Sequence, residues 1–285
     1  MPNTLDIRRR IRSVKNTQQI TKAMKMVAAA KLRRAQARML AARPYSAGLE
    51  TVLRSVASRV DAERHPLLAE RDENKVLLVV ITSDKGLAGA FNANVLKTTQ
   101  RMVAERSWSE VEVLPIGRKA SDFFKRRELA IRQSQVNVLQ ALSIETARKL
   151  AASISEDFVS GELDAVYLVY SEFVSVISQA VKAERLLPIQ RDVQDPSTPE
   201  IDYLYEPGPE QILAQLLPKY IEFQLYRALL ESAAAEQGAR MTAMEAASKN
   251  ASEMIDSLTL TYNRIRQAAI TKEIIEIVSG AAALD

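Results

Sequence analysis

The 285-residue chain has no cysteine, a single histidine (His65), and aromatic residues at only 5% of positions. Without cysteine it can form no disulfide, no thiolate-ligated zinc site and no thiol nucleophile, and one histidine cannot supply a site that needs two. No run of about 18 apolar residues is present, and the N-terminus lacks the apolar core of a signal peptide. We therefore expect a folded cytoplasmic protein with no metal, no cofactor and little of the usual catalytic repertoire.

Acidic residues are nearly missing from the start of the chain. The net charge is only +4, yet the first 43 residues hold twelve lysines and arginines against one acid, Asp6. Such a basic segment is typical of a solvated helix face, of contact with an acidic protein, of nucleic-acid binding or of an anionic membrane surface. Composition leaves these four alternatives open.

Glycine and proline are scarce at both ends of the chain, which predicts a long helix at each end, over residues 1–60 and 210–285. Pro44 is expected to kink the first helix or to mark a weak point in it. Apolar residues recur at spacings of three and four, which is typical of a coiled-coil seam. The expected seam residues are, in the first helix, Ile7, Ile11, Val14, Ile20, Met24, Val27, Ala28, Leu32, Ala35 and Met39, and in the last, Ala247, Ala251, Met254, Leu258, Thr261, Ile265 and Ala268.

The middle of the chain, residues 75–190, has a different pattern. The continuous apolar run from Val76 to Ile81 predicts a strand that is buried on both faces. Further strands are expected near 111–116, 165–170 and 176–187, alternating with helices near 92–105, 118–127 and 144–160. This alternation predicts a small, largely parallel sheet with helices on both faces, and the proline-rich residues 191–209 form a linker or foot.

These elements together predict a Rossmann-like α/β domain inserted between two long helices. Because neither helix fits inside a compact domain, we expect the two to pair as an antiparallel coiled coil. The last helix is the longer one, so its C-terminal end should extend beyond its partner.

Four segments, in order along the chain, resemble the gamma subunit of the F-type ATP synthase. They cover residues 20–31 (ITKAMKMVAAAK), 83–92 (SDKGLAGAFN), 239–247 (ARMTAMEAA) and 262–282 (YNRIRQAAITKEIIEIVSGAA). One departure is Ala88, where many members of this family have cysteine. The resemblance covers the whole chain.

The resemblance implies a central-stalk rotor subunit of a proton-translocating ATP synthase. Its partners would be three alpha and three beta subunits, an epsilon subunit and the ring of c subunits, with no nucleic acid. It would have no catalytic site of its own, and it would associate with the cytoplasmic face of the inner membrane as a peripheral protein, through the c ring only. The asymmetric coil would convert rotation of the ring into conformational changes at the catalytic sites of the beta subunits.

The resemblance also implies which residues contact partners. Contacts to the beta subunit are expected at Lys22, Met24, Lys25, Arg266 and Gln267. The apolar tip of the rotor would comprise Ile270, Ile274, Ile277 and Val278. Contacts of the foot with the c ring are expected at Tyr203, Tyr205 and Glu206.

Two rival functions remain at this stage. A basic coiled-coil protein that binds nucleic acid would explain the N-terminal charge, but not the apolar C-terminal end or the inserted domain. A nucleotide-binding enzyme would use the turn at residues 84–89, which follows a strand but lacks the full phosphate-binding patterns. We interpret that turn as structural.

Overall fold

The structure is a computed structural model that describes residues 4–57, 65–127, 129–189 and 208–282. The chain divides into two compact units. One unit consists of residues 29–240, and the other of residues 1–28 together with 241–285.

The larger unit contains a five-stranded sheet in the order β3-β2-β1-β4-β5. Strands β3, β2, β1 and β4 run parallel to one another, and β5 is antiparallel to β4. This confirms the expected largely parallel sheet, although the short β3 was not predicted. The strands are β1 (Lys75–Ile81), β2 (Glu110–Ile116), β3 (Ala130–Ile131), β4 (Ala165–Phe173) and β5 (Gln179–Leu187).

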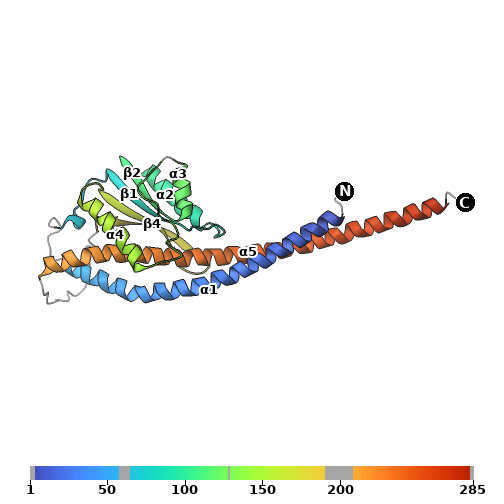
Figure 1. The fold of residues 1–285 in the computed structure, drawn as a ribbon, viewed down its shortest axis with the longest axis horizontal. Coiled ribbons are helices and arrows are strands. Elements are labelled where there is room, and N and C mark those ends of the chain that lie inside the picture. The colour runs from blue at the N-terminus through green and yellow to red at the C-terminus, as the bar shows by residue number, and fades with distance from the viewer. Residues whose placement is uncertain (1–3, 58–64, 128, 190–207, 283–285) are drawn as a thin grey trace. The chain divides into compact units, whose positions relative to one another are not determined.

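Helices cover both faces of the sheet, as the continuous apolar run of β1 predicted (Figure 1). Leu77, Val79 and Ile81 pack on one face, against α4 (Ile144–Val159) and the first part of α5 (Pro209–Ala282). The alternate residues of β1 pack on the other face, with α2 (Phe91–Glu105) and α3 (Arg118–Lys125). Both apolar cores therefore meet at β1. A short 3-10 helix, η2 (Pro66–Leu68), was not predicted and adds two leucines to the first core.

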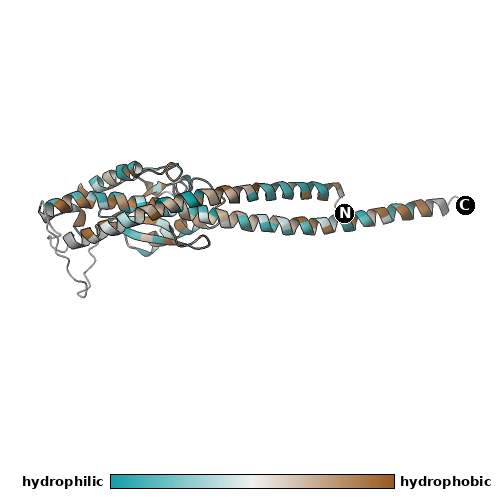
Figure 2. Cartoon of the chain, turned by 90° about the horizontal axis from the view of Figure 1, so that it is seen from below, coloured by the Kyte–Doolittle hydropathy of each residue, from teal (hydrophilic) through white to brown (hydrophobic). Residues whose placement is uncertain are grey.

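The two long helices are present, and each is unbroken. Helix α1 spans Thr4–Ala57 and continues through Pro44, while α5 spans Pro209–Ala282 and continues through Pro218. Apolar and hydrophilic residues are mixed along both helices (Figure 2). In the larger unit the two helices are in contact, since the rings of Tyr45 and Phe223 lie 4.6 Å apart.

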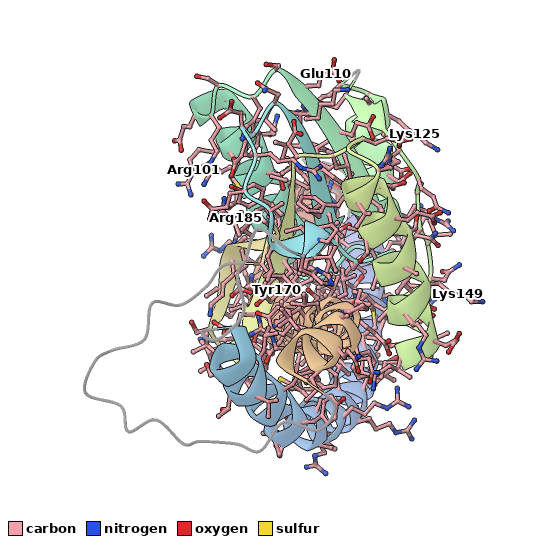
Figure 3. All side chains as sticks on the ribbon, turned by 90° about the vertical axis from the view of Figure 1, so that its left-hand side faces the viewer. Arg101, Glu110, Lys125, Lys149, Tyr170 and Arg185 are labelled. Carbon is pink, nitrogen blue, oxygen red and sulfur yellow. The ribbon has the colours of Figure 1, made fainter. Side chains whose placement is uncertain are left out.

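A polar layer connects the sheet to α5. Tyr170 extends from β4 to the side of the sheet where α5 lies (Figure 3), and its hydroxyl donates a 3.1 Å hydrogen bond to Glu184 of β5. Arg227 of α5 donates to the same carboxylate at 2.7 Å. Burial is the main cause that raises the pKa of Tyr170, so the phenol stays neutral and keeps its proton for this bond. Glu184 thus links β4, β5 and α5.

Candidate partner interface

Helices α1 and α5 run antiparallel in the smaller unit. Thr21 and Ser248 share a hydrogen bond of 2.7 Å between their hydroxyls. Four residues later on α1, Lys25 forms a 2.6 Å ion pair with Glu245, which precedes Ser248 on α5. The residue number rises on one helix as it falls on the other, so the expected antiparallel pairing is confirmed.

The seam of this helix pair is only partly the predicted one. Ile7, Ile11 and Val14 are buried or half-buried, as expected, but Ile20 and Val27 are 60% and 55% exposed. Gln18, which is half-buried, and Thr21, which is buried, lie near Ile20 along α1, and the predicted Ala28 is buried next to Val27. Thr21 can lie in the seam because its hydroxyl is paired with Ser248, which removes the cost of burying an unpaired polar group.

The predicted seam on α5 needs a similar correction. Met254 is 53% exposed, while its neighbour Ile255 is half-buried. Beyond it, Leu258, Tyr262 and Ile265 are half-buried, whereas the predicted Thr261 and Ala268 are exposed. The apolar residues at 3-4 spacing thus form two neighbouring stripes, and the inner one includes polar residues.

The helix pair exposes large apolar side chains, which sequence analysis did not predict. Those that are at least half exposed include Leu5, Ile20, Met26, Val27, Met254 and Leu260. Such a concentration of exposed apolar side chains on a helix pair is typical of a surface that another protein covers. The only signal in the sequence was the surplus of apolar residues over those that one seam requires.

Two of the residues predicted to contact the beta subunit already have contacts with other residues of this chain. Lys25 is bound to Glu245, and Met24 is half-buried, as expected for a seam residue. Lys22 is exposed and its charge faces solvent. Of the three, Lys22 is the side chain most open to an acidic partner, and the contacts of all three stay predictions.

The C-terminal part of α5 extends past the start of α1. Extending the antiparallel pairing of Thr21 with Ser248 along both helices places Thr4, the first described residue of α1, near Ile265 of α5. From Arg266 to Ser279 every residue is exposed. The predicted tip residues Ile270, Ile274, Ile277 and Val278 are 48 to 72% exposed. This end of α5 has apolar residues and no helix beside it (Figure 2).

Arg266 and Gln267 lie at the base of this extension, and both are exposed. The guanidinium of Arg266 is 5.9 Å from the ring centroid of Tyr262, one turn earlier on α5. At that distance the contact is weak and leaves the donor groups of the guanidinium available to a partner. The predicted foot residues Tyr203, Tyr205 and Glu206 lie outside the described residues.

The turn after β1 is closed by its own polar groups. The backbone N–H of Ser83 donates to the side-chain oxygen of Asn92 at 2.9 Å. One carboxylate oxygen of Asp84 accepts from the backbone N–H groups of Arg118 and Asn137, at 3.1 and 3.0 Å. Asp84 thus ties the turn to the start of α3 and to the segment before α4. This geometry favours the structural interpretation of the turn.

The described residues contain no cluster of three histidine or acidic side chains arranged for a metal ion. No helix within them combines the length and the apolar character that crossing a membrane requires.

Comparison with known proteins identifies close relatives over the full length. The sequence profile of the ATP synthase family, described as "ATP synthase", matches residues 3–284. The chain is 55% identical over 289 residues to the ATP synthase gamma chain of Solibacter usitatus, and 53% identical to that of an Anaeromyxobacter species, with both chains covered completely in each case. These relatives give the nucleic-acid alternative no support.

Solved structures show the same fold. The chain is 31% identical to a chain from the central stalk and c ring of the Tetrahymena thermophila mitochondrial ATP synthase, with a TM-score of 0.64, over 80% of this chain and 99% of that one. A chain from the Euglena gracilis mitochondrial ATP synthase has a TM-score of 0.70 at 23% identity, over 99% and 94% of the two chains.

Proposed function

Because the chain belongs to the family of ATP synthase gamma chains, we propose that it works as the central-stalk rotor subunit of a proton-translocating F-type ATP synthase. Its partners are the alpha and beta subunits, the epsilon subunit and the ring of c subunits. The observation that carries this proposal for the chain itself is the exposed, apolar end of α5, from Ile270 to Val278. An apolar helix end that is exposed to water is prone to aggregate, and a sleeve of alpha and beta subunits would cover it.

The rotor acts by being asymmetric. The helix pair of the smaller unit exposes apolar side chains at some positions, such as Ile20, Val27 and Met254, and cations at others, such as Lys22. A catalytic subunit that faces the apolar side chains therefore meets different contacts from one that faces the cations. Because the contacts differ with angle, rotation changes which conformation of each beta subunit is favoured.

The subunit has no catalytic site of its own in this proposal, and its association with the cytoplasmic face of the inner membrane is peripheral, through the c ring. The turn after β1 supports the first point, since the carboxylate of Asp84 accepts from two backbone N–H groups and so has a structural role there. Contact between the c ring and Tyr203, Tyr205 and Glu206 stays a prediction.

The purified chain alone is expected to show no ATP hydrolysis, whereas a complex isolated through a tag on this chain should hydrolyse ATP. The expected complex contains larger partner subunits in fixed stoichiometry. The measurement is phosphate release by both preparations at equal concentrations of the chain. Turnover by the isolated chain that survives rigorous removal of partner subunits would contradict the non-catalytic role, and a tagged chain that recovers no partners would contradict the rotor.

Replacing Arg266 by alanine is expected to slow the assembled complex. A charge-assisted hydrogen bond from this guanidinium to a catalytic subunit contributes about 1.5 to 3 kcal/mol, and only at the rotor angles where the bond forms. Loss of that bond changes the relative energies of the angles, so ATP hydrolysis and proton-driven synthesis should both slow. The measurement is steady-state turnover of the reconstituted complex in both directions.

The matched control is Arg264→Ala, which removes the same charge from an exposed position of the same helix two residues away. Circular dichroism of each variant verifies that helicity is unchanged. Slower turnover for Arg266→Ala alone supports the assignment, whereas wild-type rates for that variant in both directions would show that Arg266 is a solvated charge.

A further inference from the structure

A cavity of about 330 Å³ lies within the unit formed by residues 29–240. Helix α1, the turn after β1, the segment before α4 and helix α5 all contribute to its wall. Five of the lining side chains are cationic: Lys31, Arg34, Arg38, Lys85 and Arg240. The cavity thus collects positive charge from three parts of the chain that are far apart in sequence.

Only two acidic residues, Asp84 and Glu236, line the cavity, and both are already bound. Asp84 accepts from two backbone N–H groups. Glu236 forms a 2.7 Å ion pair with Arg240, and the two side chains are 10% and 12% exposed. The lining thus carries five cations against two carboxylates, an excess of three positive charges.

The other four cations are not held in close ion pairs. Among the described residues, Lys31, Arg34, Arg38 and Lys85 form no ion pair, although the charge of Lys31 acts on Glu236, where it opposes the rise in pKa that burial causes. Lys31, Arg34 and Arg38 are spaced three and four residues apart on α1, which puts them on one face of the helix. Like charges held this close repel one another, so an anion between them would be bound favourably.

The lining also indicates what kind of anion fits. Arginine side chains bind phosphate oxygens with paired N–H donors, and the amides of Gln140 and Gln237 add neutral donors at the wall. No aromatic side chain lines the cavity, so a nucleobase would have nothing to stack on. The volume is at the lower end of the range of small-molecule sites, about 300 to 1,000 Å³.

We propose that this cavity is a binding site for a compact phosphate anion, of the class of pyrophosphate or the phosphate chain of a nucleotide. The anion bridges the α1 arginines and Lys85, and so ties α1 to the turn after β1. Recognition is by charge and by phosphate geometry, and none of the described residues that are predicted to contact partners lines the cavity.

The test is calorimetric titration of the full-length chain with pyrophosphate, at low and at physiological ionic strength. Saturable binding of one pyrophosphate per chain is expected, weaker at the higher ionic strength because salt screens the cations. Parallel titrations with inorganic phosphate, ADP and ATP identify the source of the phosphate. If the base is not read, ADP and pyrophosphate should bind within about threefold of each other.

The variant Arg34→Gln/Arg38→Gln should weaken pyrophosphate binding by at least about tenfold, since each guanidinium supplies a charge-assisted bond. The matched control is Arg33→Gln on the same helix, which is exposed and does not line the cavity. It should change the affinity by less than about twofold. Lys85→Gln, on a different element, provides a second test if the double variant loses helicity by circular dichroism.

Three results would overturn the proposal. The first is the absence of saturable binding by pyrophosphate, phosphate, ADP and ATP. The second is equal weakening by Arg33→Gln and by the cavity variants, which would indicate non-specific attraction to a basic helix. The third is binding of an aspartate- and glutamate-rich peptide in the absence of any phosphate binding, which would make the cavity a contact for an acidic protein segment.

Discussion

Replacing Gly117 by alanine is expected to destabilise the α/β unit by more than about 3 kcal/mol, from backbone strain and steric overlap together. Gly117 has φ 100°, a conformation that residues with a side chain rarely adopt, and it connects β2 to α3. A Cβ atom on Gly117 would lie 2.1 Å from the carbonyl oxygen of Thr82. No side-chain rearrangement relieves this overlap, because the opposing atom belongs to the backbone.

The surrounding backbone has little freedom to move away. The N–H of Thr82 donates to the carbonyl of Ile116 at 2.8 Å, and the N–H of Gly117 donates to that of Gln135 at 2.7 Å. Moving Thr82 would therefore break hydrogen bonds at the carboxyl edge of the sheet. We expect the variant to unfold at markedly lower denaturant concentration, or not to fold, as measured by circular dichroism in urea.

The control is Gly86→Ala, in the turn after β1. A Cβ atom there would come no closer than 3.9 Å to another group, the Cε of Lys119, and the backbone of Gly86 is not in the left-handed region. The substitution should change the free energy of unfolding by less than about 0.5 kcal/mol. Equal midpoints for the Gly117 and Gly86 variants would contradict the steric argument.

The sequence predicted the α/β unit well because burial on both faces leaves a simple signature. Every residue of β1 after Lys75 is apolar and fully buried, so the strand was recognisable without its neighbours. The two-residue strand β3 was not, since Ala130 and Ile131 are too few to show a period. Their place in the sheet depends on pairing with β2, which is a contact between distant residues.

The coiled coil was predicted as a pair of helices, but its seam was partly wrong. Ile20 and Val27 match a seam pattern as well as the true seam residues do, because a surface that contacts a partner also requires apolar side chains at helical spacing. A sequence pattern does not distinguish apolar side chains that are buried inside the chain from apolar side chains that a partner covers. Thr21 was missed for the opposite reason, since its pairing with Ser248 depends on a residue far along the chain.

The cavity in the larger unit was not predictable. Arg240 was noted only as part of a segment that resembles the gamma-subunit family, yet its guanidinium donates to the backbone carbonyls of Lys85 and Gly86, at 3.4 and 3.3 Å. Nothing in the turn after β1 indicates which helix it meets. Contacts of this kind come from the packing of α5 on the sheet, which sequence periodicity does not specify.

Replacing Glu236 by alanine is expected to destabilise the larger unit by roughly 3 kcal/mol, because it leaves the guanidinium of Arg240 nearly buried without its counter-ion. The ion pair between them is 2.7 Å long, and both side chains are about nine-tenths buried. The two carbonyl oxygens of the turn also accept from Arg240, but they supply no full negative charge. The measurement is urea unfolding of the full-length chain, followed by circular dichroism.

The same ion pair is expected to contribute little net stability. Burial raises the pKa of Glu236 and the nearby charge of Asp84 adds to this, while Arg240 and Lys31 oppose it. A carboxyl whose pKa is raised on folding favours the folded state most at pH below its unfolded value, and this contribution is lost as the pH rises through the folded value. At neutral pH the ionised Glu236 is therefore a cost that its partners do not fully offset.

A variant in which both members are replaced by apolar residues of similar volume, Glu236→Leu/Arg240→Met, should thus be much closer to wild type than Glu236→Ala is. We expect it within about 1 kcal/mol of the wild-type free energy of unfolding, since it removes both buried charges at once. It should also lack the decline in stability that Glu236 causes as the pH rises above the usual carboxyl range. If Glu236→Ala alone costs less than about 1 kcal/mol, the carbonyl groups of Lys85 and Gly86 suffice for Arg240, and the ion pair does not hold the turn on α5.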